Sequence, residues 1–158
     1  MVDLCQIPRA REGRCIDPRR VTLSDFQERA MQIRRDILGD EHVDRANSSI
    51  TPFSRPFQEY ITRVAWGEIW GRPGLSLRER SLMTLAMMAV TRQEHELAVH
   101  VRLARRNGLS VEEIAEALLH AGLYGGAAAA NTSFAIAQRT LAELGEPDAI
   151  PLRDEQPV

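Results

Sequence analysis

The chain has 158 residues, of which 44% are hydrophobic and 27% charged, and its formal net charge is −2. This length and composition are typical of one globular domain with its own hydrophobic core. So small a charge excludes the bulk attraction to nucleic acid or anionic membrane that basic proteins show. No apolar run approaches the roughly 20 residues of a membrane span, so neither nucleic acid nor membrane is expected as a partner.

The N-terminal segment is basic and polar, and it contains both cysteines, Cys5 and Cys15. No histidine lies near them, so they form neither a disulfide framework nor a zinc-binding pattern. The first twenty residues also lack the apolar core of a secretory signal. We therefore predict a disordered basic leader over residues 1–22 and a cytoplasmic location.

The first half of the remaining chain predicts three helices. A capping box at Ser24 and Gln27 begins the first one, and Gly39 ends it. A short helix is expected over residues 41–46, followed by a loop over 47–56. The third helix, residues 57–70, ends where glycine and proline recur at Gly71, Pro73 and Gly74.

The second half predicts four more helices, over residues 77–90, 93–106, 110–124 and 128–144. Serine followed three residues later by glutamate marks two of their starts, at Ser76 and Ser110. The helix 77–90 is apolar nearly all round, which is typical of burial in a core or an oligomer interface. We expect a single-domain, all-α bundle of about six helices over residues 23–145, and a loose tail over 146–158.

Two glutamates and two histidines lie within seven residues of the helix 93–106: Glu94, His95, Glu96 and His100. His95 and His100 are five residues apart, which places them about 140° apart around a regular helix. They cannot bind one metal ion together, whereas histidines four residues apart can. No metal is therefore expected.

Glu96 and His100 are four residues apart and share one face of that helix. A carboxylate in this position can orient the imidazole and raise its pKa, as in a general acid/base site. The alternative is an ordinary exposed ion pair, or a histidine at the border of the core. Leu97, Val101 and Ala104 form the neighbouring apolar stripe, so both readings stay open.

Arg63, Trp66 and Trp70 recur at helical spacing i, i+3 and i+7, and these tryptophans are the only two in the chain. Gly67 lies beside them and leaves room. An arginine next to two indoles can bind a flat carboxylated ligand, because the guanidinium fork holds carboxylate and the rings form apolar walls. Helix packing is the alternative. Arg80, which leads into the apolar helix, is a further candidate for a pocket.

Four segments together resemble the carboxymuconolactone decarboxylase and alkylhydroperoxidase-D (AhpD) superfamily. They are "MQIRRDILGDEHVDR", "FQEYITRVAWGEIWGRPGLSLRERSLMTLAM", "ELAVHVRLARRNGLSVEEIAEALLHAGLYGG" and "AAANTSFAIA". They follow in the order of the family and cover about residues 26–144. The resemblance implies an AhpD-like all-α fold that assembles as a homo-oligomer, a trimer or a hexamer. It also implies loss of CO2 from 4-carboxymuconolactone to give 3-oxoadipate enol-lactone in protocatechuate breakdown, without cofactor or metal.

The peroxidase branch of this superfamily uses two cysteines and a histidine, and their positions fall here at Gln93, Glu96 and His100. Both cysteines are missing, so a thiol-disulfide relay cannot operate. Gly125 is a departure from the decarboxylase pattern, in which we expect a cysteine or another small residue at this position. The leader lies outside the resemblance.

From the residues and the resemblance together we expect His100 and Glu96 to be catalytic. We expect Arg63, Arg80, Trp66 and Trp70 to bind a carboxylated lactone. His100 would donate a proton or stabilise the oxyanion, and Glu96 would orient it. Three alternatives remain: an enzyme for a related carboxylated lactone, a thiol-independent relative of the peroxidase branch, or a non-catalytic helical binding protein.

Overall fold

The computed structural model describes residues 22–149, which are all-α and contain no strand, as expected. The elements are α1 (Leu23–Leu38), α2 (Asp40–Ser48), α3 (Arg55–Ile61), the π-helix η2 (Thr62–Trp70), α4 (Leu77–Val90), α5 (Glu94–Arg106), α6 (Val111–Gly125), α7 (Ala127–Glu143) and the 3-10 helix η3 (Pro147–Ala149). The predicted leader lies outside the described residues except for Thr22.

The helix ends follow local capping chemistry. The capping boxes at Ser76 and Ser110 are present as predicted. For α1 the predicted cap, Ser24, is wrong, because the capping box forms two residues earlier, between Thr22 and Asp25. The Thr22 hydroxyl accepts from the Asp25 amide at 3.2 Å, and the Asp25 carboxylate accepts from the Thr22 amide at 2.8 Å.

The predicted helix over residues 57–70 is continuous from α3 but changes its hydrogen-bond register at Thr62. From there the backbone forms a π-helix, and the Gly71 amide donates to the carbonyl of Trp66, five residues earlier, at 3.0 Å. Residues five apart now lie above one another. The i, i+3, i+7 face expected for an α-helix therefore does not apply to this segment.

The first four elements form an N-terminal layer in which α1 packs along η2. Gly67 makes this close approach possible, since a Cβ there would lie 2.9 Å from both the Ala30 Cβ and the Phe26 Cζ. The room expected beside Gly67 is therefore filled by α1. At the inner end of the layer, Ile37 and Trp66 pack with Leu103 of α5.

The helices α4 to α7 form a C-terminal bundle around the main apolar core. Gly122 lets α7 approach α6, because a Cβ there would lie 2.8 Å from the Cβ of Ala130. The predicted loose tail is wrong at its start: Ala149 is buried in this core, and the Glu146 carboxylate accepts from Arg105 Nε at 2.7 Å. Residues 150–158 lie outside the described part of the chain.

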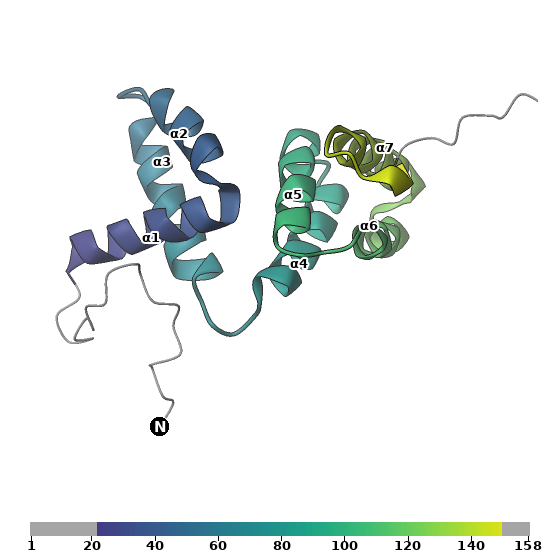
Figure 1. The fold of residues 1–158 in the computed structure, drawn as a ribbon, viewed down its shortest axis with the longest axis horizontal. Helices are drawn as coiled ribbons and strands as arrows, with labels where there is room; N and C mark the ends of the chain where they lie inside the picture. The colour runs from purple at the N-terminus through teal and green to yellow at the C-terminus, as the bar shows by residue number, and fades with distance from the viewer. Residues whose placement is uncertain (1–21, 150–158) are drawn as a thin grey trace, which may run out of the picture.

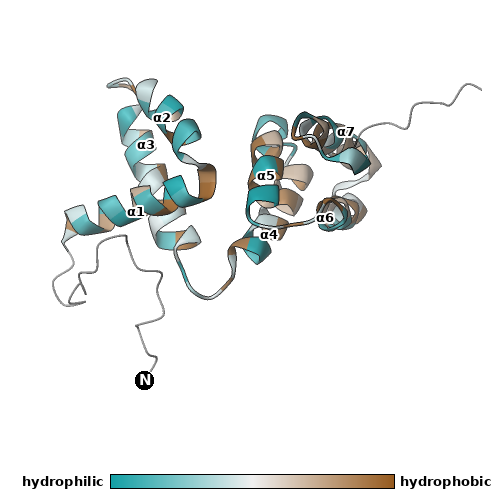
Figure 2. Cartoon of the chain, in the orientation of Figure 1, coloured by the Kyte–Doolittle hydropathy of each residue, from teal (hydrophilic) through white to brown (hydrophobic). Residues whose placement is uncertain are grey.

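Helix α5 joins the two parts, because it carries two different buried stripes. Leu97, Val101 and Ala104 belong to the core of the bundle, whereas Leu103 packs against the N-terminal layer. Figure 1 shows α5 as the bundle helix nearest to α1 and α2. In Figure 2 hydrophobic segments concentrate among the bundle helices, while α1 and α2 are mostly hydrophilic. No helix of residues 22–149 could span a membrane.

Candidate active site

The second stripe of α5 brings His100 against Trp70 of η2. The rings of Trp70 and His100 stack, with centroids 6.4 Å apart and planes inclined by 19°. Trp66 follows behind Trp70, at a centroid distance of 5.6 Å. Three of the six predicted site residues are thus brought together, across the junction of the N-terminal layer and the bundle.

His100 is held in an environment that disfavours its charged form. Burial lowers the pKa of its imidazole below the ordinary value, and the nearby Glu96 carboxylate only partly offsets this effect. The ring atom Nδ1 is buried and has no hydrogen-bond partner among residues 22–149. A neutral imidazole with an unpartnered buried nitrogen is suited to donate or accept one hydrogen bond from a ligand.

Glu96 lies in the first turn of α5 and is exposed. It acts on two imidazoles, because its charge raises the pKa of His42 as well as that of His100. His42 of α2 is half-buried and lies near Glu96, and burial, Arg45 and Arg34 lower its pKa.

Arg63 does not lie free beside the tryptophans. Its guanidinium pairs with the carboxylate of Glu68 at 2.6 Å, and both side chains are more than two-fifths exposed. The pairing follows from the π-helix, which places residues five apart on one side. The α-helical spacing that linked Arg63 with Trp66 and Trp70 is therefore wrong here.

Arg80 is buried, as expected for a side chain at the start of the apolar helix. Its Nη2 donates to the carbonyl of Arg72 at 3.0 Å, which ties α4 to the turn that follows η2. Its Nε is buried without a partner among the described residues. The side chain thus has a clear structural contact and one buried N–H without a partner among the described residues.

Sequence reasoning missed Arg34 of α1, which is only 5% exposed. Its guanidinium donates to Thr62 Oγ1 at 3.1 Å and to Gln58 Oε1 at 3.4 Å. A signal was present, because Arg34 lies between Ala30 and Ile37 on the apolar stripe of α1. An arginine on such a stripe has to be buried together with it.

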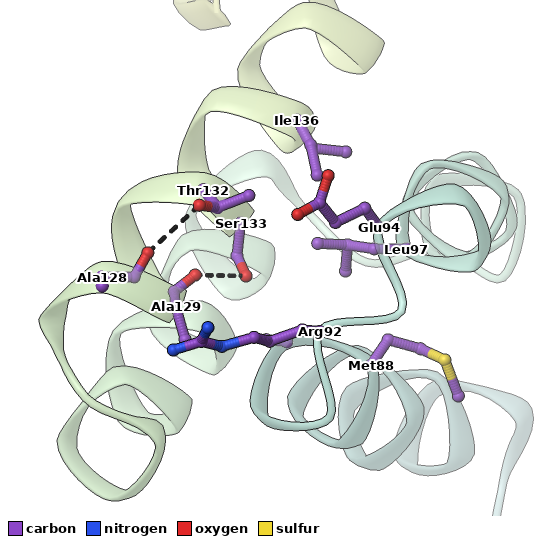
Figure 3. Close-up of a pocket in the computed structure, with 10 residues that line it drawn as sticks. Met88, Arg92, Glu94, Leu97, Ala128, Ala129, Thr132, Ser133 and Ile136 are labelled. Atoms are coloured by element: carbon purple, nitrogen blue, oxygen red, sulfur yellow. Dashed lines mark hydrogen bonds between the residues drawn. The ribbon is translucent and has the colours of Figure 1, made fainter.

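A separate cavity of about 110 Å³ lies between the α4–α5 turn and α7. Figure 3 shows Arg92 and Glu94 at its edge, opposite Thr132 and Ser133. Both hydroxyls already donate to carbonyls of α7, and His100 is not among the lining residues. A wider groove of about 550 Å³ lies between α6 and α7, and His100 is not among its lining residues either. Residues 22–149 contain no cluster of three potential metal ligands.

Comparison with known proteins identifies the family. The model of the carboxymuconolactone decarboxylase family matches residues 55–139, more than half of the chain. The chain belongs to this family. The match covers η2 and α5, which carry the tryptophans and His100, and it confirms the AhpD-like all-α fold class expected from the resemblance.

Three relatives have decarboxylase names. The 4-carboxymuconolactone decarboxylase of Acinetobacter baylyi is 37% identical over 118 residues, which cover 75% of this chain and 88% of the relative. The nitrosuccinic acid decarboxylase npaB of Metarhizium robertsii is 40% identical, over 74% of this chain and 82% of the relative. A 4-carboxymuconolactone decarboxylase of Pseudomonas putida is 53% identical over 38 residues, 24% of this chain and 79% of the relative.

Proposed function

We propose that this protein is a carboxy-lyase that converts 4-carboxymuconolactone to 3-oxoadipate enol-lactone and CO2 in protocatechuate breakdown. The Acinetobacter baylyi relative, which matches most of both chains, supports this reaction. The structural observation that carries the proposal is the stack of His100 on Trp70, which holds an unpartnered Nδ1 in a buried site.

The reaction needs no external electron acceptor, because the lactone contains its own. The bond between the ring carbon and the leaving carboxylate breaks, and its electron pair moves through the C=C bond into the lactone carbonyl. The resulting dienolate then takes up one proton at carbon, which balances the loss of CO2. The protein must hold the substrate, stabilise the dienolate oxygen and supply that proton.

We assign two of these tasks to His100: stabilisation of the dienolate oxygen and supply of the proton. Its lowered pKa leaves the imidazole neutral near pH 7 in the free protein, so a ring N–H is available as a hydrogen-bond donor. Nδ1 is the atom that lacks a partner, and an N–H there would donate a hydrogen bond to the dienolate oxygen. To pass a proton to carbon, His100 would first take up a proton from solvent, and the negative charge of Glu96 supports that transient imidazolium.

Trp66 and Trp70 form the apolar wall of this site. The leaving carboxylate loses its charge as CO2 forms, so an environment without water or cations favours its departure. The tilted indole pair beside His100 offers such a surface. We keep Arg80 as a candidate ligand of a substrate carboxylate, because its Nε has no partner among the described residues. Arg63 is a weaker candidate, because its guanidinium already pairs with the carboxylate of Glu68.

Nitrosuccinic acid is a second candidate substrate, because the npaB relative is as similar to this chain as the Acinetobacter one. A nitro group can accept an electron pair as a nitronate, just as the lactone carbonyl does as a dienolate. The same site could therefore serve both reactions. Both compounds carry two carboxylates, only one of which leaves.

Self-association and a cytoplasmic location are part of the proposal. Large apolar side chains are exposed along α4 and α6, including Met83, Met87, Leu119, Leu123 and Tyr124. Such a face supports burial against further copies of the chain in a trimer or a hexamer. Sedimentation velocity of the purified protein would measure the state. A monomer would contradict the proposed self-association.

The test of the activity is a spectrophotometric assay with freshly generated 4-carboxymuconolactone, in the presence of EDTA and without thiols. Nitrosuccinic acid is assayed in parallel by CO2 release. Rapid conversion of the lactone supports the proposal, whereas turnover of nitrosuccinic acid alone moves the protein to the second candidate. If a well-folded protein converts neither compound, the proposed function is wrong.

A further inference from the structure

Arg34 is a buried cation that the protein does not neutralise within residues 22–149. Its two hydrogen-bond acceptors, the Thr62 hydroxyl and the Gln58 amide oxygen, carry no charge. Its Nε is buried and has no partner in this part of the chain. Burial also lowers the pKa of the guanidinium, and the charge of Arg35 lowers it further.

The neighbouring arginine shows that carboxylates are within reach of this helix. Arg35 pairs with Asp40 at 3.1 Å and with Asp44 at 2.6 Å, although it is less buried than Arg34. An isolated buried charge is strongly unfavourable, whereas a paired and hydrogen-bonded one is tolerated. The fold thus leaves the more buried of the two guanidinium groups without an anion.

Arg34 lies at the same junction as the candidate active site. Its partner Thr62 begins η2, the helix that carries Trp66 and Trp70. Ile37, one turn after Arg34, packs with Trp66 and with Leu103 of α5, one turn after His100. His42 feels the charges of both Arg34 and Glu96, so both groups lie near it.

We propose that Arg34 binds the carboxylate that the substrate keeps through the reaction. This inference rests on the proposed function. A guanidinium offers five N–H donors in a fork that matches a carboxylate, and two of them are engaged by Thr62 and Gln58. The unused Nε–H and the remaining Nη–H donors can complete the pair.

The retained carboxylate is the chemically sensible partner of this cation. A guanidinium bound to the leaving carboxylate would stabilise the charge that must disappear and so would oppose the reaction. A guanidinium bound to the other carboxylate positions the substrate without that penalty. Arg34 would therefore determine specificity, and it requires substrates with a second carboxylate.

The experiment uses the only two tryptophans, Trp66 and Trp70, as reporters of binding. Purified full-length protein is titrated with succinate, a dicarboxylate that cannot follow the reaction, while tryptophan fluorescence is recorded. Arg34→Met should raise the Kd at least tenfold, because a charge-assisted bidentate contact is lost. Arg35→Gln, which removes one charge from the neighbouring position, should leave the Kd within about twofold.

Thermal unfolding separates binding from a purely structural role. Succinate should raise the Tm of the wild type by mass action but not that of Arg34→Met, which without ligand should be as stable as the wild type or more so. An unchanged Kd in Arg34→Met, or no fluorescence response of the wild type up to tens of millimolar succinate, would overturn the proposal. If Arg34→Met does not fold, Arg34→Lys replaces it and should also weaken binding, because an ammonium lacks the planar fork.

Turnover distinguishes this inference from the proposed function. If the wild type converts the lactone, Arg34→Met should raise KM by about tenfold to a hundredfold with a smaller change in kcat. Unchanged KM would refute the role of Arg34 and leave the activity intact. If the wild type converts neither the lactone nor nitrosuccinic acid but binds succinate through Arg34, the anion site stands and the proposed function falls.

Discussion

Trp70 of the N-terminal layer stacks on His100 of the bundle, with ring centroids 6.4 Å apart. The contact joins two parts of the chain that otherwise meet mainly through α1 and α5. The imidazole is buried by a side chain from the other part of the fold, so its environment depends on how the two parts pack. Changes at this junction should therefore alter the chemistry of His100.

Replacement of Trp70 by alanine should raise the pKa of His100 towards its ordinary value of about 6.5, because burial is the main cause of the present depression. NMR titration of the His100 ring protons measures this directly. Trp66→Ala is the comparison, since Trp66 lies behind Trp70 and should affect the pKa less. A pKa unmoved by Trp70→Ala would contradict the contact.

The stability of the protein should fall as the pH is lowered from about 7 to 5. The pKa values of His42 and His100 are both below the ordinary value in the folded state, so between the folded and unfolded pKa the unfolded chain binds more protons. This contribution to the free energy of unfolding is complete above about pH 6.5 and is lost as the pH falls. Urea unfolding across this range measures it.

The double variant His42→Gln/His100→Gln provides the control for this pH dependence. Its unfolding free energy should change less between pH 7 and 5 than that of the wild type, because the two depressed groups are gone. If the unfolding free energy falls equally with pH in the two proteins, groups other than His42 and His100 account for the acid sensitivity.

Gly67→Ala should destabilise the protein by about 1–3 kcal/mol, because the new Cβ would lie 2.9 Å from Phe26 Cζ and Ala30 Cβ. Chemical denaturation measures the change. Gly74→Ala is the matched control, because a Cβ at that position meets nothing within 4 Å. Similar stabilities of the two variants would contradict the tight packing of α1 on η2.

Arg63→Gln and Arg80→Gln should behave differently. Arg63 is half exposed and paired with Glu68, so its loss should change KM for the lactone by less than about threefold. Arg80 is buried and holds the Arg72 carbonyl, so its loss should lower stability by about 1–3 kcal/mol. Steady-state kinetics and thermal unfolding of both variants measure this. A large KM increase in Arg63→Gln would restore the role expected from the sequence.

Much of the fold follows from local signals in the sequence. The serine–glutamate boxes at Ser76 and Ser110 and the positive-φ Gly39 and Gly126 define helix ends without reference to the rest of the chain. The apolar stripe of α5 likewise predicted the core of the bundle. The leader and most of the tail were predicted from composition and lie outside the described residues.

The site was less predictable, because it depends on tertiary contacts. No feature of residues 62–70 predicts a π-helix. The α-helical spacing assumed for them put Arg63 on the same face as Trp66 and Trp70, and this spacing does not hold in a π-helix. The hydrogen bond of Arg34 to Thr62 and the nearness of His42 to Glu96 depend on how the helices pack, so the sequence did not predict them. The sequence named His100, Trp66 and Trp70 as candidates, and the structure brings their rings together, while their roles in the reaction stay predictions.

The measurement that tests the account most directly is the turnover of 4-carboxymuconolactone by His100→Ala, compared with the wild type under the same conditions. Loss of the group that stabilises the dienolate or delivers the proton should lower kcat by roughly 100-fold or more. Circular dichroism of the variant should match the wild type. A folded His100→Ala protein with wild-type kcat would remove His100 from the reaction and contradict the proposed site.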